Sequence, residues 1–193
     1  MSTRLPAEKR RTQLLTVGVE VFAERGFHAT SMDDIAIAAG VTKPVLYKHF
    51  PSKRALYLQL LDEVDEQLME QLVAATAHAE TGRERVQEGF AAYFRFVAEN
   101  RAAFRLLFGA SVRNDPEFSS VAEGSIERIA DLVAQLIEID APTKHRQVLA
   151  HAIVGMAEAT SRRLANDDGE PDPDRLAAWL AEMAWFGLRG VRA

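Results

Sequence analysis

The stretch that decides the fold is TSMDDIAIAAGVTKPVLYKHFPSKRALY, residues 30–57. Ser31, with an acidic residue three positions later, predicts the start of a short helix, because two such side chains can cap the free backbone N–H groups of the first turn. Gly40 predicts a turn after about two turns of helix, and Pro44 fits the first turn of a second helix. Pro51 ends that second helix. The stretch therefore predicts two short helices joined by a glycine turn.

Helical periodicity continues on both sides of this stretch, whereas sustained period-two alternation is absent. A first helix is expected from about Glu8 to Arg25, where Gly26 ends it. Later helices are expected at about 52–79, 84–100, 102–110, 116–139, 144–166 and 174–191. The sequence thus predicts an all-α chain of about nine helices. A three-helix helix-turn-helix domain (residues 1–53) is joined by a long helix to a carboxy-terminal helical bundle within residues 54–193.

The two short helices have the dimensions of a helix-turn-helix, a unit that places its second helix in the major groove of DNA. The apolar residues of the unit pack inward, so the polar side of the second helix faces outward. On that side Lys43 can donate to guanine or to a phosphate, and Pro44 can contact a thymine methyl group. The side chains of Tyr47, His49 and Lys53 are better suited to contacts with DNA phosphates. Double-stranded DNA is therefore the expected partner.

The charge distribution agrees with this placement. The net charge is −5, which by itself disfavours a nucleic-acid binder. Residues 1–53 carry eight Lys and Arg against five Asp and Glu, a net +3, while residues 54–193 carry 15 against 23, a net −8. A phosphate-binding surface is therefore expected only near the amino terminus.

The stretch from Thr30 to Tyr57, with Phe22-Ala23 and Gly26-Phe27 before it, resembles the signature of the TetR family of bacterial repressors. The resemblance covers about Lys9 to Leu58. It implies that the DNA surface is formed by Thr42, Lys43, Pro44, Tyr47, Lys48 and His49, and that Ser31 and Lys53 anchor the DNA backbone. It also implies a homodimer that presents two reading helices to a roughly palindromic operator.

The same resemblance implies that the carboxy-terminal domain dimerises through its last two long helices. Small or aliphatic side chains on those helices are the expected interface: Ala150, Val154, Ala157, Ala177, Leu180, Ala184 and Leu188. A second interpretation remains open, because most apolar stripes on helices only close the protomer's own bundle.

The resemblance further implies a small-molecule effector in each protomer. An aromatic concentration between residues 90 and 118 is the feature that could form an apolar pocket, which would bind a hydrophobic or aromatic ligand. The expected lining is Tyr93, Phe94, Phe108, Phe118 and Met156. Aromatic residues at this spacing also fill cores, so this alternative stays open as well. Effector binding is expected to release a repressor from its operator; the alternative is a regulator of the same fold without a ligand.

Other classes of function are disfavoured by the sequence. The chain has no cysteine, and it contains no phosphate-binding loop, dinucleotide fingerprint or nucleophile elbow, so neither an enzyme nor a bound cofactor is expected. No metal site is expected either: His145 and His151 are six residues apart, and the acidic segment 167–174 lacks the ligand order of a calcium loop. The polar amino terminus is followed by no apolar run long enough to span a membrane, which predicts a cytoplasmic protein.

Overall fold

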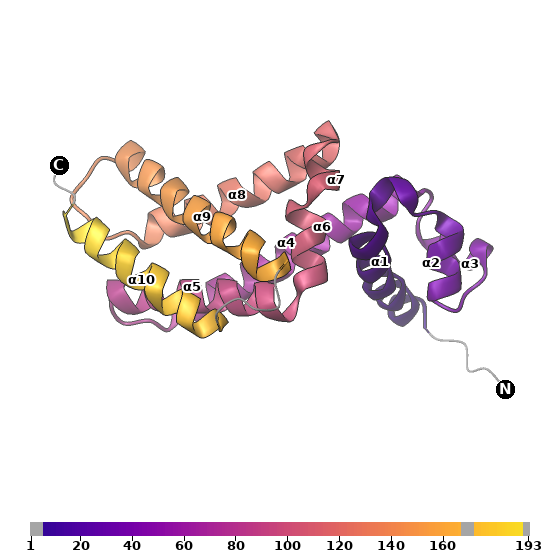
Figure 1. Ribbon diagram of the computed structural model, residues 1–193, viewed down its shortest axis with the longest axis horizontal. Coiled ribbons are helices and arrows are strands. Elements are labelled where there is room, and N and C mark those ends of the chain that lie inside the picture. The colour runs from indigo at the N-terminus through magenta and orange to yellow at the C-terminus, as the bar shows by residue number, and fades with distance from the viewer. Residues whose placement is uncertain (1–5, 167–171, 191–193) are drawn as a thin grey trace. The chain divides into compact units, whose positions relative to one another are not determined.

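The computed structural model describes residues 6–166 and 172–190, and every regular element in these ranges is a helix. The predicted all-α fold is therefore confirmed. Ten helical segments follow one another (Figure 1): α1 (Ala7–Ala29), α2 (Met32–Ala38), α3 (Lys43–His49), α4 (Lys53–Ala77), α5 (Gly82–Glu99), α6 (Arg101–Phe108), α7 (Ala110–Arg113), α8 (Pro116–Leu136), α9 (Thr143–Asn166) and α10 (Pro173–Gly190).

One helical segment was not predicted from the sequence: the single turn α7. It follows Gly109, where an added Cβ would lie 2.1 Å from the carbonyl oxygen of Arg105. Only glycine lets the chain pass this close to the end of α6. Gly26 has a φ of 77° inside α1, so the first helix is broken where the sequence predicted its end, and a further turn follows the break.

The chain divides into two compact units, one comprising Met1–Val64 with Ala102–Ala122 and the other comprising Asp65–Arg101 with Glu123–Ala193. This division differs from the predicted boundary after Lys53. The reason is that the first turns of α4 belong to the core of the first unit. Leu56 and Leu60 are fully buried, and an added Cβ at Gly18 of α1 would lie 3.0 Å from Leu60 Cδ1.

The first unit has an aromatic cluster as part of its core. The ring of Phe118 lies 4.9 Å from that of Phe27 and 4.5 Å from that of Tyr57, and Phe22 meets Tyr57 edge-on at 5.0 Å. Edge-to-face pairs of this kind add about 0.5–1.5 kcal/mol beyond the burial of apolar area. The cluster joins α1, α4 and α8 within this unit.

In the second unit, α5 packs against both α9 and α10. Tyr93 and Phe94 of α5, Ala150 of α9 and Ala177 of α10 are buried there. The buried carboxylate of Asp65 accepts a 2.5 Å hydrogen bond from Arg128 Nη1 and so has a charged partner. Within the described residues, no helix is both long and apolar enough to cross a membrane.

Candidate nucleic-acid interface and ligand cavity

The helix α2 begins with the predicted capping box. Asp34 N donates to Ser31 Oγ over 3.1 Å, and Ser31 N donates to Asp34 Oδ2 over 2.8 Å. The hydrogen bond from the Ser31 side chain is the main reason why the pKa of Asp34 lies below its ordinary value. Ile35 and Ala36 turn inward and are buried, as the sequence predicted. Ser31 itself is exposed, so its proposed contact with DNA stays a prediction.

A tight turn around Gly40 sets the direction in which α3 leaves α2. Gly40 has a φ of 64°, and its N–H donates to Ile37 O while Val41 N–H donates to Ala36 O. These two bonds satisfy carbonyl groups at the end of α2. Apart from Gly40 itself and its two chain neighbours, no heavy atom of the described residues lies within 4 Å of a Cβ added at Gly40. The turn therefore requires glycine for its backbone conformation and not for lack of space.

Helix α3 has one buried anchor and a broad exposed face. Leu46 is fully buried, whereas Thr42, Lys43, Pro44, Tyr47 and Lys48 are exposed and His49 is partly exposed. The Lys43 amine donates to Asp33 Oδ2 of α2 over 2.9 Å, which raises the pKa of Lys43. The structure thus places the predicted base-reading and phosphate side chains of this helix together on one accessible surface.

Lys53 is held differently from the lysines of α3. Its Nζ donates to the carbonyl oxygens of Phe27 and Thr30, both at 2.7 Å, and lies 4.4 Å from the centre of the Phe27 ring. The Lys53 amine therefore binds the last turn of α1 and the connection between α1 and α2. Its predicted contact with DNA phosphate stays a prediction.

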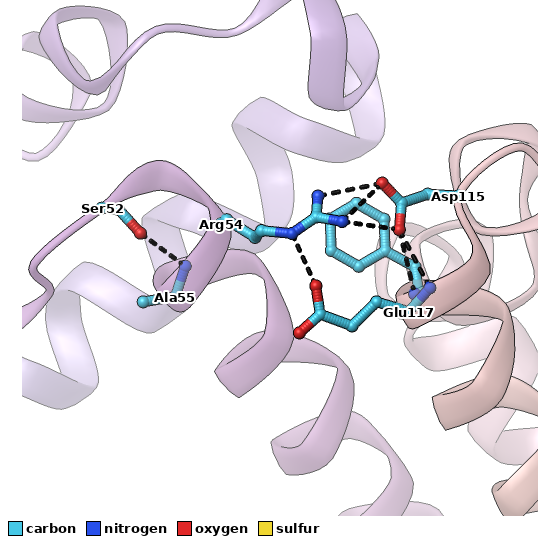
Figure 2. Close-up of polar contacts among 6 residues, drawn as sticks. Ser52, Arg54, Ala55, Asp115 and Glu117 are labelled. Carbon is cyan, nitrogen blue, oxygen red and sulfur yellow. Dashed lines mark hydrogen bonds and ion pairs between the residues drawn. The ribbon is translucent and has the colours of Figure 1, made fainter.

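The start of α4 is fixed to the start of α8 within the first unit, as Figure 2 shows. Arg54 donates through Nη1 and Nη2 to both carboxylate oxygens of Asp115, at 2.8–2.9 Å, and through Nε to Glu117 over 2.6 Å. Its guanidinium also lies 4.6 Å from the centre of the Phe118 ring. Asp115 Oδ1 accepts hydrogen bonds from the backbone of Glu117 and Phe118, so the same carboxylate caps α8.

A cavity of about 370 Å³ lies in the second unit. Its wall is mostly aliphatic and comes from α4, α5, α8, α9, α10 and the segment after α8: Leu72, Thr76, Gly82, Arg85, Val86, Gly89, Phe90, Tyr93, Ile129, Leu132, Val133, Leu136, Ile137, Glu138, Ile139, Asp140, Ile153, Val154, Ala157 and Trp185. Such a volume with an apolar wall and few polar groups is typical of a site for a small molecule.

Of the five predicted pocket residues, Tyr93 lines this cavity. The other four do not, which corrects the prediction for them. Phe94 follows Tyr93 on α5, points elsewhere and is fully buried in the core. Phe108 and Phe118 belong to the first unit, where Phe118 packs on Phe27 and Tyr57. Met156 is half-buried but is not part of the wall. The aromatic enrichment is thus divided between two cores.

The cavity wall that the sequence reasoning missed is aliphatic. Four residues of α8, with spacings of three, one and three, face the cavity: Ile129, Leu132, Val133 and Leu136. This helical spacing is visible in the sequence and indicates an apolar face. What the face covers depends on the packing of several helices, which the spacing does not reveal.

The predicted dimer residues are mostly buried inside the protomer. Ala150, Val154, Ala157, Ala177 and Ala184 are at most 6% exposed, Leu180 is half-buried, and the Leu188 side chain lies outside the described residues. Val154 and Ala157 line the cavity. The five buried side chains therefore favour the second interpretation, in which small residues on α9 and α10 pack within the protomer. For Leu180 and Leu188 the dimer contact stays a prediction. The acidic segment 167–171 also lies outside the described residues.

The same two helices leave large apolar side chains exposed. On α10, Trp179, Met183 and Phe186 are 48–59% exposed, and their spacings of four and three place them on one face. On α9, Val148 is 62% exposed. The Arg175 guanidinium covers one side of Trp179, 4.9 Å from the ring centre. A face of this kind on a protein surface indicates an interaction site.

Comparison with known proteins identifies the family of the chain. Residues 14–60 match the model "Bacterial regulatory proteins, tetR family", and residues 82–187 match "Tetracyclin repressor-like, C-terminal domain". The HTH-type transcriptional activator FasR of Mycolicibacterium smegmatis is 35% identical over 190 residues, which are 97% of this chain and 87% of FasR. The repressor KstR2 of Rhodococcus jostii is 48% identical over 52 residues, 27% of this chain and 26% of KstR2.

Solved structures give the same result at the level of the fold. The crystal structure of a TetR-like transcriptional regulator from Rhodococcus sp. RHA1 matches with a TM-score of 0.82 and 32% identity, covering 97% of this chain and all of that one. With its amino-terminal helix-turn-helix and its carboxy-terminal helical domain, this chain is a DNA-binding transcriptional regulator, not an enzyme, and belongs to the TetR family.

Proposed function

We propose that the chain is a cytoplasmic, homodimeric regulator that reads a palindromic operator with the exposed face of α3 and responds to an apolar ligand in the cavity of the second unit. The observation that carries the first part is the burial pattern of α3. Leu46 anchors the helix, while Lys43 and Lys48 are exposed beside Pro44 and Tyr47. This face combines donors for base edges and phosphates with apolar atoms for thymine methyl groups.

The dimer is proposed to form through α9 and α10, by the face that carries Trp179, Met183 and Phe186. Two copies of one exposed apolar patch can cover each other around a twofold axis. Aromatic and methionine side chains are enriched at such interfaces. A twofold dimer presents two copies of α3, and each copy then meets one half-site of the operator.

The response to ligand is proposed to travel along α4 and α8, which each lie partly in both units. Leu72 and Thr76 of α4 line the cavity, while the same helix begins at Lys53, four residues after the end of α3. A ligand that binds better to one arrangement of these helices shifts the population toward that arrangement. The ligand can then change the affinity for DNA by at most the ratio of its own affinities for the two arrangements.

Repression with release by the ligand is the proposed direction. Activation is the second candidate, because the relative of 35% identity over nearly the whole chain is an activator. The two outcomes differ in where the operator lies relative to the promoter and not in how α3 binds DNA. A promoter fused to a reporter gene distinguishes them: deletion of the regulator raises expression under repression and lowers it under activation.

Nuclease footprinting on operator fragments tests the proposed function. We expect protection of one twofold-symmetric site at modest salt, and loss of that protection when an apolar ligand of the cavity is added. Val133→Phe, which fills part of the cavity, should weaken the response to ligand, whereas Val73→Phe on the exposed side of α4 should not. Absence of any sequence-selective protection would overturn the proposal.

A further inference from the structure

The cavity contains one basic residue among the described residues of its wall, Arg85 of α5. The Arg85 side chain is only 23% exposed and forms an ion pair with Glu138 through Nη1. A guanidinium carries five N–H donors in a planar fork that matches a carboxylate. The contact with Glu138 is made by Nη1, and the guanidinium has further N–H donors with which it can bind a second carboxylate.

Glu138 is a weakly held partner of Arg85. Its side chain is 64% exposed, and it lies two residues after the end of α8 at Leu136. One of its carboxylate oxygens, Oε2, would lie 3.7 Å from a Cβ added at Gly82, the first residue of α5. A carboxylate therefore already lies at the polar side of the cavity wall. Because Glu138 is mostly in water, its displacement costs little free energy.

The polar groups deeper in the cavity wall have partners within the protein. The Thr76 hydroxyl donates to Leu72 O over 2.8 Å, and the Tyr93 hydroxyl is hydrogen-bonded to Ser161. Burial raises the pKa of Tyr93, so this phenol stays neutral. A ligand thus meets apolar atoms over most of the wall, a partly buried cation at Arg85, and two exposed carboxylates, Glu138 and Asp140.

We propose that the ligand of this cavity is an amphipathic acid, an apolar chain or ring system with one carboxylate, and that its carboxylate takes the place of Glu138 on Arg85. The proposal rests on the proposed function, since it names the chemistry of the ligand in the same cavity. A cationic head group is disfavoured because Arg85 is the partly buried charge of the wall, whereas water screens the exposed carboxylates Glu138 and Asp140. A neutral hydroxyl group would form weaker hydrogen bonds than a carboxylate does.

Three probes with the same apolar chain and different head groups test this inference: dodecanoate, 1-dodecanol and dodecylammonium. Isothermal titration calorimetry at neutral pH, below the concentrations at which the probes aggregate, gives the dissociation constants. We expect dodecanoate to bind at least about tenfold more tightly than 1-dodecanol, since hydrogen bonds between charged groups are stronger than hydrogen bonds to a neutral hydroxyl group. Dodecylammonium should bind most weakly.

Two variants assign the effect to the ion pair. Arg85→Met should bring the dodecanoate and 1-dodecanol affinities to within about threefold of each other. Arg83→Met removes the same charge from an exposed position on the same turn and should leave the preference intact. Glu138→Gln should tighten dodecanoate severalfold and leave 1-dodecanol unchanged, because it removes the competing carboxylate. Glu88→Gln, exposed on α5, is its matched control.

The outcomes separate this inference from the proposed function. Equal affinities for the three probes, tighter binding of dodecylammonium, or equal effects of Arg85→Met and Arg83→Met would overturn the acid proposal. In each of these cases, an apolar ligand site would still be supported if 1-dodecanol bound to the chain and Val133→Phe weakened that binding. If none of the probes bound, both the acid proposal and the ligand cavity would be wrong.

Discussion

At the scale of single residues, Lys53 and Lys48 have the same charge and different surroundings. Lys48 is exposed on α3, whereas the Lys53 amine donates to two backbone carbonyls at 2.7 Å. Lys53→Met should therefore lower the free energy of unfolding by about 1–3 kcal/mol, because two carbonyl acceptors lose a charged donor. Thermal unfolding measures this change.

Lys48→Met is the control for that prediction. It should leave the melting temperature unchanged and should lower the slope of log affinity against log salt by about one, as expected for a lost phosphate contact. If Lys53→Met reduced the salt slope without reducing stability, the assignment of the Lys53 amine to the backbone carbonyls would be wrong.

Tyr57 should make the stability of the protein depend on pH in the alkaline range. Burial raises its pKa to about 12, and its hydroxyl lies 3.3 Å from Leu106 O. In the unfolded chain the phenol ionises near its ordinary pKa of about 10, so its stabilising contribution is present below pH 10 and is lost as the pH rises toward 12. At pH 11 the loss is about 1.4 kcal/mol.

Comparison of melting temperatures at pH 8 and pH 11 checks this prediction. Tyr57→Phe should show a smaller decrease than the unsubstituted chain, and Tyr47→Phe, at an exposed position, should show the same decrease as the unsubstituted chain. A decrease for Tyr57→Phe as large as that of the unsubstituted chain would contradict the role assigned to the buried phenol.

At the scale of elements, Arg54 fixes the start of α4 to the start of α8. Arg54→Met should lower the free energy of unfolding by about 1–3 kcal/mol, since Asp115 is only 16% exposed and loses a bidentate partner. A double-mutant cycle with Asp115→Asn should give a coupling of at least about 0.5 kcal/mol. Arg25→Met, at an exposed pair with Asp34, should change stability by less than this. Additive effects of the Arg54 and Asp115 substitutions would contradict the assigned link.

The exposed face of α10 gives a prediction about assembly. Phe186→Asp should raise the dissociation constant of the dimer about thirtyfold or more, as expected when an apolar anchor is replaced by a charge. Val73→Asp adds the same charge at an exposed position of α4 and should leave the dimer intact. Sedimentation velocity distinguishes the two outcomes. An unchanged Phe186→Asp dimer would exclude this face as the interface.

The elements were predictable where the signals are local. The capping box at Ser31, Gly40 in the turn and Pro44 in α3 act through neighbours a few residues away, so the sequence defines α2 and α3 directly. The faces of the later helices depend on distant neighbours. Tyr93 and Phe94 are adjacent, yet only Tyr93 lines the cavity. For the same reason, five of the seven predicted dimer residues on α9 and α10 proved to be buried within the protomer.

At the scale of the whole molecule, the charge partition and the two units agree. Residues 1–53, which carry a net charge of +3, lie in the first unit together with α3. The cavity lies in the second unit. The DNA-reading face that we propose on α3 and the proposed ligand cavity thus lie in separate units that share α4 and α8.

The central claim is that the exposed face of α3 reads base pairs. Selection of bound duplexes from a random-sequence pool, followed by sequencing, tests it most directly. We expect a twofold-symmetric motif, and Lys43→Ala should change the preference at one or two symmetry-related positions of that motif while the rest is retained. No enriched motif at modest salt, or a Lys43→Ala motif identical to that of the unsubstituted chain, would contradict the claim.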